Sequence, residues 1–230
     1  MKAVIIDMSG VLINTTTTEK KAWNKVFNPF LRDHNARYLF NEEDYETFFE
    51  GKPKYERVQN YLDHRNIHLP TGKPDDSPGY HSVYGLEKKK SKVFTHMLNK
   101  GELKIYEKAL QKIKFWREQG LKVAVVSSDE NFKKALATLD IEHFFDVIIE
   151  RHASRKKGLK EKPEADLYIQ AVKELGLAPE SCVLIDDSVQ GLRAGSKGNF
   201  GLVVGVNRGD NRVALSENGA DIVIDNFDDL

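Results

Sequence analysis

Residues 2–14, which read KAVIIDMSGVLIN, decide the fold of this chain. Residues 3–6 form a short apolar run, which is typical of a strand that is buried on both faces of a sheet. The run ends in Asp7, and Gly10 follows three residues later. In open α/β sheets, an acid at the carboxyl end of a buried strand lies where ligands bind. An aspartate can also simply cap the next turn, and this stretch alone leaves both interpretations open.

The charge and cysteine content exclude several classes of function. The 230 residues include 35 basic side chains (Lys plus Arg) and 35 acidic ones, so nothing indicates a general attraction to nucleic acid or to an anionic membrane. The single cysteine, Cys182, excludes an internal disulfide, fits a reducing compartment and lies in an apolar run that predicts a core position. No apolar segment approaches ~18 residues, and residues 1–10 do not resemble a secretory signal. We therefore expect a cytosolic protein without membrane or nucleic-acid partners. We also expect the protein to be a monomer.

Residues 15–90 are predicted to form a small all-helical insert. The four threonines at 15–18 read as a linker that ends in a helix cap. Apolar residues at helical spacing predict helices over residues 19–32, around residues 58–62 and through residues 93–98, and Asn41 is the expected cap of a short helix over residues 41–49. Residues 69–84 contain three prolines and two glycines and are expected to be loop.

From residue 105 onward, predicted helices and strands alternate. Further strands are expected over residues 121–127, 145–149, 182–185, 202–206 and 222–224. This alternation is typical of a parallel sheet that is covered by helices on both faces. We predict an α/β fold with a Rossmann-like, doubly wound parallel sheet made by residues 1–14 and 91–230. The helical domain, residues 15–90, is inserted after the first strand.

Polar side chains end most of the predicted strands. Asp7 ends the first strand, Ser127 the second, and Asp186 and Asp187 follow the fourth. The carboxyl ends of parallel strands meet at one edge, so these acids need a positive partner, and Mg²⁺ prefers a few carboxylates together with water and phosphate oxygens. Lys162 could supply a second positive charge there, although a lysine at the start of a helix can also simply be solvated.

Four segments resemble, in order and spacing, the motifs of the haloacid dehalogenase-like superfamily. They are DMSGV at residues 7–11, Ser127, KP at 162–163 and DDS at 186–188. The resemblance covers most of the chain, and four motifs in order make it specific. The helical insert looks like the cap domain of the β-phosphoglucomutase-like branch. Within that branch, phrases such as GKPKYERVQNYL at 51–62 are similar to a sugar-phosphate subgroup.

The resemblance implies a role for each matched residue of the core. Asp7 would be the nucleophile and would form an aspartyl-phosphate. Ser127 and the backbone amide of Ser128 would hydrogen-bond the transferred phosphoryl group. Lys162 would neutralise the nucleophile and the phosphoryl oxygens.

The resemblance also implies a metal site and contacts from the cap. Mg²⁺ would be held by the backbone carbonyl of Ser9 and by the carboxylates of Asp7, Asp187 and Asp186. In the cap, Lys54, Arg57 and Lys90 lie where relatives carry basic residues that grip the other end of the substrate. Lysine-rich helices are more often solvated, so this second interpretation stays open for all three residues. The connections at residues 15–18 and 79–85 are predicted to act as hinges.

Ser9 is the main departure from the family pattern. Phosphatases and mutases of the family carry a second aspartate two residues after the nucleophile, which protonates the leaving oxygen and then deprotonates the attacking water or hydroxyl. A serine hydroxyl is far too weak an acid for this, and such catalysis is typically worth ~10²–10⁴-fold. Metal binding should survive, because the position contributes a main-chain carbonyl.

Smaller departures lie around the same site. Asp186 stands where this branch usually has glutamate. Lys54 stands where the subgroup usually has arginine, and a lysine cannot bind an anion through two parallel hydrogen bonds as arginine does. Glu87 and Ser91 replace a glycine and an asparagine of the subgroup. Several changes around one crevice indicate altered or lost activity.

Three classes of function remain open. The first is a Mg²⁺-dependent phosphohydrolase that acts on a small phosphorylated metabolite, by resemblance a sugar phosphate, through Asp7. The second is a binding protein that keeps the metal site and the phosphate cradle but has lost proton transfer. The third is another chemistry on the same fold, namely that of a β-phosphoglucomutase, a dehalogenase or a phosphonate-cleaving enzyme.

Particular residues disfavour each member of the third class. A mutase must donate and accept protons at sugar hydroxyls, and Ser9 removes that capacity. A dehalogenase needs no metal, whereas the acid pair Asp186 and Asp187 is retained. Phosphonate cleavage needs a lysine that forms a Schiff base, and the spacing of Lys54 and Lys90 gives no sign of one.

Overall fold

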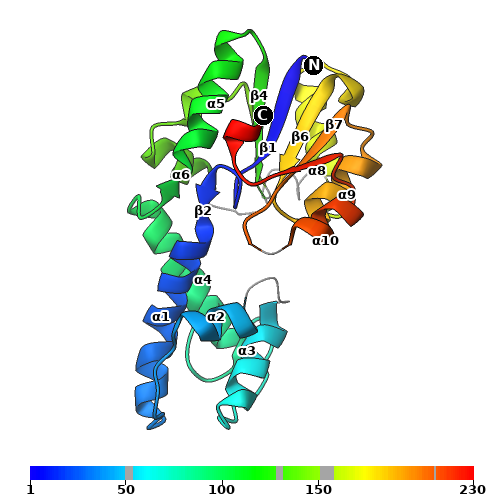
Figure 1. Ribbon diagram of the computed structural model, residues 1–230. Coiled ribbons are helices and arrows are strands. Elements are labelled where there is room, and N and C mark those ends of the chain that lie inside the picture. The colour runs from blue at the N-terminus through cyan, green and yellow to red at the C-terminus, as the bar shows by residue number, and fades with distance from the viewer. Residues whose placement is uncertain (50–53, 128–131, 151–157, 210) are drawn as a thin grey trace. The chain divides into compact units, whose positions relative to one another are not determined.

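The computed structural model describes residues 1–49, 54–127, 132–150, 158–209 and 211–230. These residues divide into two compact units, shown in Figure 1. The core unit consists of Met1–Thr15 and Leu103–Leu230, and the helical unit is Thr16–Glu102. The boundary expected at residue 90 falls inside helix α4 (Val83–Asn99). None of the helices among the described residues is long and apolar enough to cross a membrane.

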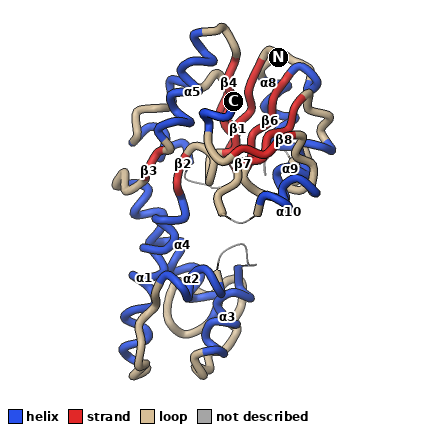
Figure 2. Tube along the Cα trace, viewed as in Figure 1, coloured by secondary structure: helices blue, strands red, loops and turns tan. Residues whose placement is uncertain are grey.

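The core unit is built on a six-stranded sheet, drawn in red in Figure 2. The strand order is β5-β4-β1-β6-β7-β8, and every neighbouring pair is parallel. The strands are β1 (Ala3–Asp7), β4 (Lys122–Ser127), β5 (Val147–Glu150), β6 (Cys182–Asp186), β7 (Leu202–Val206) and β8 (Ile222–Ile224). The predicted α/β class and the six predicted strands are therefore confirmed.

Side chains that alternate along the strands bury both faces of the sheet. In β1, Val4 and Ile6 join one hydrophobic cluster, whereas Ala3 and Ile5 join the other. The first cluster is covered by α5 (Glu107–Glu118) and α6 (Phe132–Thr138). The second is covered by α8 (Asp166–Glu174), α9 (Val189–Lys197) and α10 (Arg212–Glu217), and it contains Cys182, which is fully buried as predicted.

Several short elements complete the core unit. Strands β2 (Ile13–Asn14) and β3 (Lys104–Ile105) pair in antiparallel fashion beside the main sheet. Short 3₁₀ helices cover Glu142–Phe144, Pro179–Ser181 and Phe227–Asp229. The small pair of strands and the 3₁₀ turns were not predicted, because segments of two or three residues carry no periodicity.

The helical unit has its own aromatic core. Its helices are α1 (Thr15–Asp33), α2 (Glu42–Phe48), α3 (Lys54–His64) and α4. Trp23, Phe27 and Phe49 pack at its centre together with Tyr61. Asn41 caps α2 through a capping box, as expected. Helix α4 begins at Val83, inside the segment expected to be loop, because the Ser82 hydroxyl caps it by accepting from the Gly85 amide.

Candidate active site

The sheet reverses its order between β1 and β6, and two acids lie at that point. From β1 the chain continues to β4 and β5 on one side, and only later to β6, β7 and β8 on the other. Such a switch point opens a crevice at the carboxyl ends of the strands. Asp7 ends β1 and Asp186 ends β6, and the residues directly before them, Ile6 and Ile185, are paired across the two strands. The topology therefore brings together residues that are far apart in the sequence.

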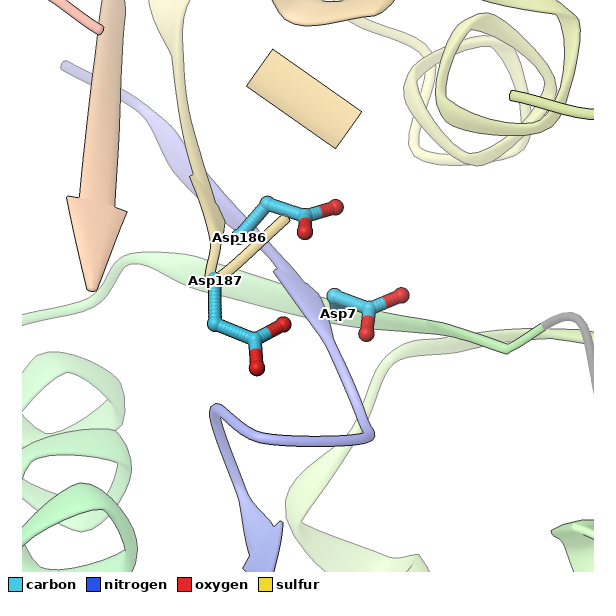
Figure 3. Close-up of side chains that lie close together, drawn as sticks. All are labelled: Asp7, Asp186 and Asp187. Atoms are coloured by element: carbon cyan, nitrogen blue, oxygen red, sulfur yellow. The ribbon is translucent and has the colours of Figure 1, made fainter. Parts of the chain in front are cut away.

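Asp7, Asp186 and Asp187 form the cluster shown in Figure 3. One carboxylate oxygen from each residue lies within 4.8 Å of the others. Asp7 and Asp186 are buried, and Asp187 is partly buried. Carboxylate oxygens at this spacing are the donors that a hard divalent cation such as Mg²⁺ takes. The residues fit the magnesium site that the sequence predicts.

Lys162 lies between two of the three carboxylates. Its Nζ is 2.7 Å from Asp7 Oδ1 and 2.7 Å from Asp186 Oδ2. Burial alone would lower the pKa of this ammonium, but the negative charges of Asp186 and Asp7 raise it well above its usual value. Lys162 is therefore a permanently charged part of the site, and the alternative of a solvated lysine at a helix start is wrong.

Asp186 is surrounded by donors from the protein. Its Oδ1 accepts from the Ser188 amide at 2.8 Å and from the Ser188 hydroxyl at 2.7 Å. Its Oδ2 accepts from Lys162 and from the Tyr168 hydroxyl. A carboxylate offers about four lone-pair sites, so a direct bond to a metal would displace one of these donors. The contacts give Asp186 the role of holding Lys162, beside its predicted role as a metal ligand.

Asp187 has no such donors. No described residue donates a hydrogen bond to its carboxylate, which packs instead against the backbone of Gly10. A Cβ at Gly10 would lie 1.6 Å from Asp187 Oδ2, and Gly10 has a φ of +75°, so only glycine fits there. Burial and the charges of Asp186 and Asp7 raise the pKa of the Asp187 carboxyl well above its usual range. A bound cation would favour the ionised form of this carboxyl.

Ser9 lies in the turn that follows β1. Among the described residues, none donates a hydrogen bond to its backbone carbonyl, although neighbouring carbonyls of the turn accept bonds. The carbonyl is therefore available for the predicted metal contact. Ser127 ends β4 and is buried, on the strand next to β1. Ser128, predicted to bind the phosphoryl group through its amide, lies outside the described residues.

The comparisons with known proteins give the family. A model of the haloacid dehalogenase-like hydrolases matches residues 1–199, which is most of the chain. The chain belongs to the haloacid dehalogenase-like (HAD) hydrolases. The predicted hydrolase-type enzyme and the stated resemblance are both confirmed at this level.

Two named relatives match this HAD hydrolase over nearly all of its length. It is 30% identical over 240 residues to the β-phosphoglucomutase of Mycobacterium bovis, covering 100% of this chain and 91% of that protein. It is 26% identical to a phosphorylated carbohydrates phosphatase of Thermotoga maritima, covering 96% and 92%. A HAD hydrolase of Deinococcus radiodurans, solved with bound phosphate and sodium, has the same fold, with a TM-score of 0.74 at 24% identity over 100% of this chain and 93% of that one.

In the helical unit of the HAD hydrolase, two of the predicted substrate-binding cations form ion pairs with glutamates of the same unit. The Arg57 guanidinium donates to both carboxylate oxygens of Glu87, at 2.7 and 3.2 Å. The Lys90 ammonium pairs with Glu19 and is only 4% exposed. The solvated interpretation is therefore wrong for Arg57 and Lys90, yet each charge is already neutralised within its own unit. The side chain of Lys54 lies outside the described part of the structure.

Two residues near the carboxylates were not predicted. Tyr168 is fully buried and donates to Asp186, and Arg208 donates to the backbone carbonyls of Gly10 and Val11. Tyr168 lies among the apolar residues of α8, where the sequence pattern predicts only a core position for an aromatic residue. Arg208 follows the carboxyl end of β7, and that position was the one signal that could have indicated it.

Proposed function

We propose that this HAD hydrolase is a Mg²⁺-dependent phosphohydrolase that acts on a small phosphorylated metabolite, a sugar phosphate, through an aspartyl-phosphate on Asp7. The observation that carries the proposal is the Lys162 ammonium, held 2.7 Å from both Asp7 and Asp186 beside the open Asp187 carboxylate. A fixed cation next to the nucleophile stabilises the charge of a transferred phosphoryl group. The names of the mutase and phosphatase relatives support a phosphorylated sugar as the substrate.

The chain's own residues account for most of the proposed chemistry. A carboxylate oxygen of Asp7 attacks phosphorus while the bond from phosphorus to the leaving oxygen breaks. Lys162 stays protonated throughout and balances the negative charge around Asp7. The carboxylates of Asp7 and Asp187 and the Ser9 carbonyl would hold Mg²⁺, which supplies further charge neutralisation at the phosphoryl oxygens. Water then hydrolyses the aspartyl-phosphate and restores Asp7.

Ser9 limits both halves of this reaction. The leaving oxygen must take its proton from solvent, and the attacking water has no carboxylate to accept its proton, because a serine hydroxyl does not exchange protons near neutral pH. Reaction with unactivated sugar phosphates should therefore be slow. A mutase activity is disfavoured for the same reason.

Ser9 also favours a second candidate function. A protein that keeps the carboxylate cluster and Lys162 but turns over no substrate would act as a binder of phosphorylated ligands. The two candidates differ in whether the native protein releases phosphate.

Steady-state phosphate release decides between them. Native protein, Asp7→Asn and Ser9→Asp would be compared on an aryl phosphate and on a panel of sugar phosphates, with and without Mg²⁺. Ser216→Asp, the same substitution at an exposed serine of α10, is the matched control. Mg²⁺-dependent release by the native protein and none by Asp7→Asn supports the enzyme. Release by Ser9→Asp alone supports the binder, and release by Asp7→Asn equal to that of the native protein contradicts both.

A further inference from the structure

Arg208 lies outside the four motif segments but contacts the turn that follows the nucleophile. Its Nε donates to the Gly10 carbonyl at 2.5 Å, and its Nη2 donates to the Val11 carbonyl at 3.4 Å. Its guanidinium carbon lies 3.8 Å from the centroid of the Tyr106 ring. All of these residues belong to the core unit. Arg208 therefore joins the carboxyl end of β7 to the turn after β1.

In the turn at residues 8–13, one carbonyl accepts no hydrogen bond from any residue that the structure describes. Met8 O accepts from the Leu12 and Ile13 amides, and Ile13 O accepts from the Gly10 amide, each at 2.9 Å. Leu12 O accepts from the Tyr106 amide, also at 2.9 Å. Arg208 donates hydrogen bonds to the carbonyls of Gly10 and Val11. Among the described donors, none is directed at Ser9 O, so the Ser9 carbonyl stays available.

Arg208 also acts on the Asp187 side of the carboxylate cluster. Lys162 contacts Asp7 and Asp186, whereas Asp187 packs on the Gly10 backbone whose carbonyl Arg208 holds. The two predicted metal ligands nearest this turn, Ser9 O and Asp187, are thus both supported by one side chain.

We propose that Arg208 is a positioning residue for the magnesium site: it fixes the turn so that the Ser9 carbonyl and the Asp187 carboxylate are both available to one cation. This role rests on the metal site of the proposed function. It differs from a purely structural role, because it predicts a change in Mg²⁺ affinity and not only in stability.

Calorimetric titration with Mg²⁺ alone tests the proposal without substrate. Arg208→Met removes the charge and both hydrogen bonds, and we expect it to weaken Mg²⁺ binding by about tenfold or more, as for other outer-shell partners. Arg208→Lys keeps the positive charge but lacks the paired N–H donors of the guanidinium. Its Mg²⁺ affinity should lie between those of Arg208→Met and the native protein. Arg212→Met is the control: it breaks an exposed ion pair with Asp225 in the same region and should keep native affinity.

Amide hydrogen exchange is a second measurement, and it tests the stability of the turn directly. In Mg²⁺-free protein, the amides of Gly10, Leu12 and Ile13 should exchange hydrogen faster in Arg208→Met than in Arg212→Met. The positioning role alone would be overturned if Arg208→Met showed the Mg²⁺ affinity and the exchange rates of the native protein. If Arg208→Met does not fold, the same result in Arg208→Lys would overturn it. A native protein that binds no Mg²⁺ would instead overturn the metal site and, with it, the proposed function.

Discussion

In the proposed mechanism, Ser9 is the residue that decides whether the site can transfer a proton. It stands two positions after Asp7, in a turn whose backbone geometry is set by other residues, so its side chain can change without moving the turn. Its carbonyl is available whatever the side chain. A loss of acid–base function is therefore compatible with an intact site for the metal and the nucleophile.

The first prediction concerns the leaving group. Because the leaving oxygen receives no proton from Ser9, native protein should act much faster on aryl phosphates than on alkyl or sugar phosphates. Ser9→Asp should raise the rate on alkyl phosphates by about 10²–10⁴-fold and change the aryl rate far less. The check is the ratio of kcat/KM for the two classes in both proteins. Equal native rates on aryl and alkyl phosphates would rule out this account.

A second prediction at the residue scale concerns Tyr168. Burial and the charge of Asp186 raise the pKa of the Tyr168 phenol well above its usual value, so it remains a donor to Asp186 at any working pH. Tyr168→Phe should leave Lys162 less firmly held and lower the rate about 10-fold to 100-fold. Phe200, whose ring packs against Tyr168, offers the comparison Phe200→Leu, which disturbs the same pocket but leaves the hydroxyl in place. Equal losses in both variants would show a packing effect alone.

Among the elements, α1 shows where local propensity was overridden. Four consecutive threonines do not favour a helix, yet α1 begins at Thr15. Thr18 is buried, and its hydroxyl donates to the Glu102 carbonyl 84 residues away. This contact is tertiary, so no reading of residues 15–18 alone could predict it. The connection expected at residues 79–85 also lies inside the helical unit, which the chain leaves at Glu102.

Helix α4 carries a buried lysine, which gives a prediction on pH. Burial lowers the pKa of Lys90, although Glu19 acts in the opposite direction. The folded state then binds fewer protons than the unfolded state, so the free energy of unfolding should rise with pH up to the unfolded-state pKa of about 10.4. Lys90→Met lacks this group, so the stability of the native protein relative to Lys90→Met should increase between pH 7 and about 10.

Urea unfolding of both proteins across that range measures the difference. Lys89→Met is a control on the same helix, since Lys89 lies over the Tyr80 ring and is not fully buried. A native-minus-Lys90→Met difference that stays constant with pH would show that the lysine titrates normally.

At the scale of the molecule, the two units have separate hydrophobic cores. Phe27 lies at the centre of the helical unit and contacts the rings of Trp23 and Tyr61. Phe27→Ala should destabilise that unit by about 3–5 kcal/mol. Because no residue of the metal site lies in it, Mg²⁺ affinity should be unchanged.

Hydrogen exchange of the whole protein separates the two effects. Faster exchange confined to residues 16–102, with a native Mg²⁺ titration, is the expected result. Phe115→Ala, at a half-exposed position of α5, is the control and should alter neither. Exchange that rises equally in both units would show that they unfold as one.

The sequence predicted most of the sheet but only part of the site, for physical reasons. Buried parallel strands are continuous apolar runs, so β1, β4 and β6 are visible locally, and topology then places Asp7 beside Asp186. Arg208 contacts Gly10 across 198 residues, and the role proposed for it depends on the shape of a turn that no sequence pattern encodes. Arg57 was expected to grip a substrate, and only the structure pairs it with Glu87.

The most direct test of the central claim is to trap the phosphorylated enzyme. Native protein, Asp7→Asn and Ser9→Asp would be mixed with an aryl phosphate and Mg²⁺, quenched in acid and mapped by mass spectrometry. Because Ser9 cannot activate water, the native protein should accumulate one phosphoryl group on Asp7, Ser9→Asp should accumulate less and Asp7→Asn none. A phosphoryl group on any other residue, or equal labelling of Asp7→Asn, would contradict the account.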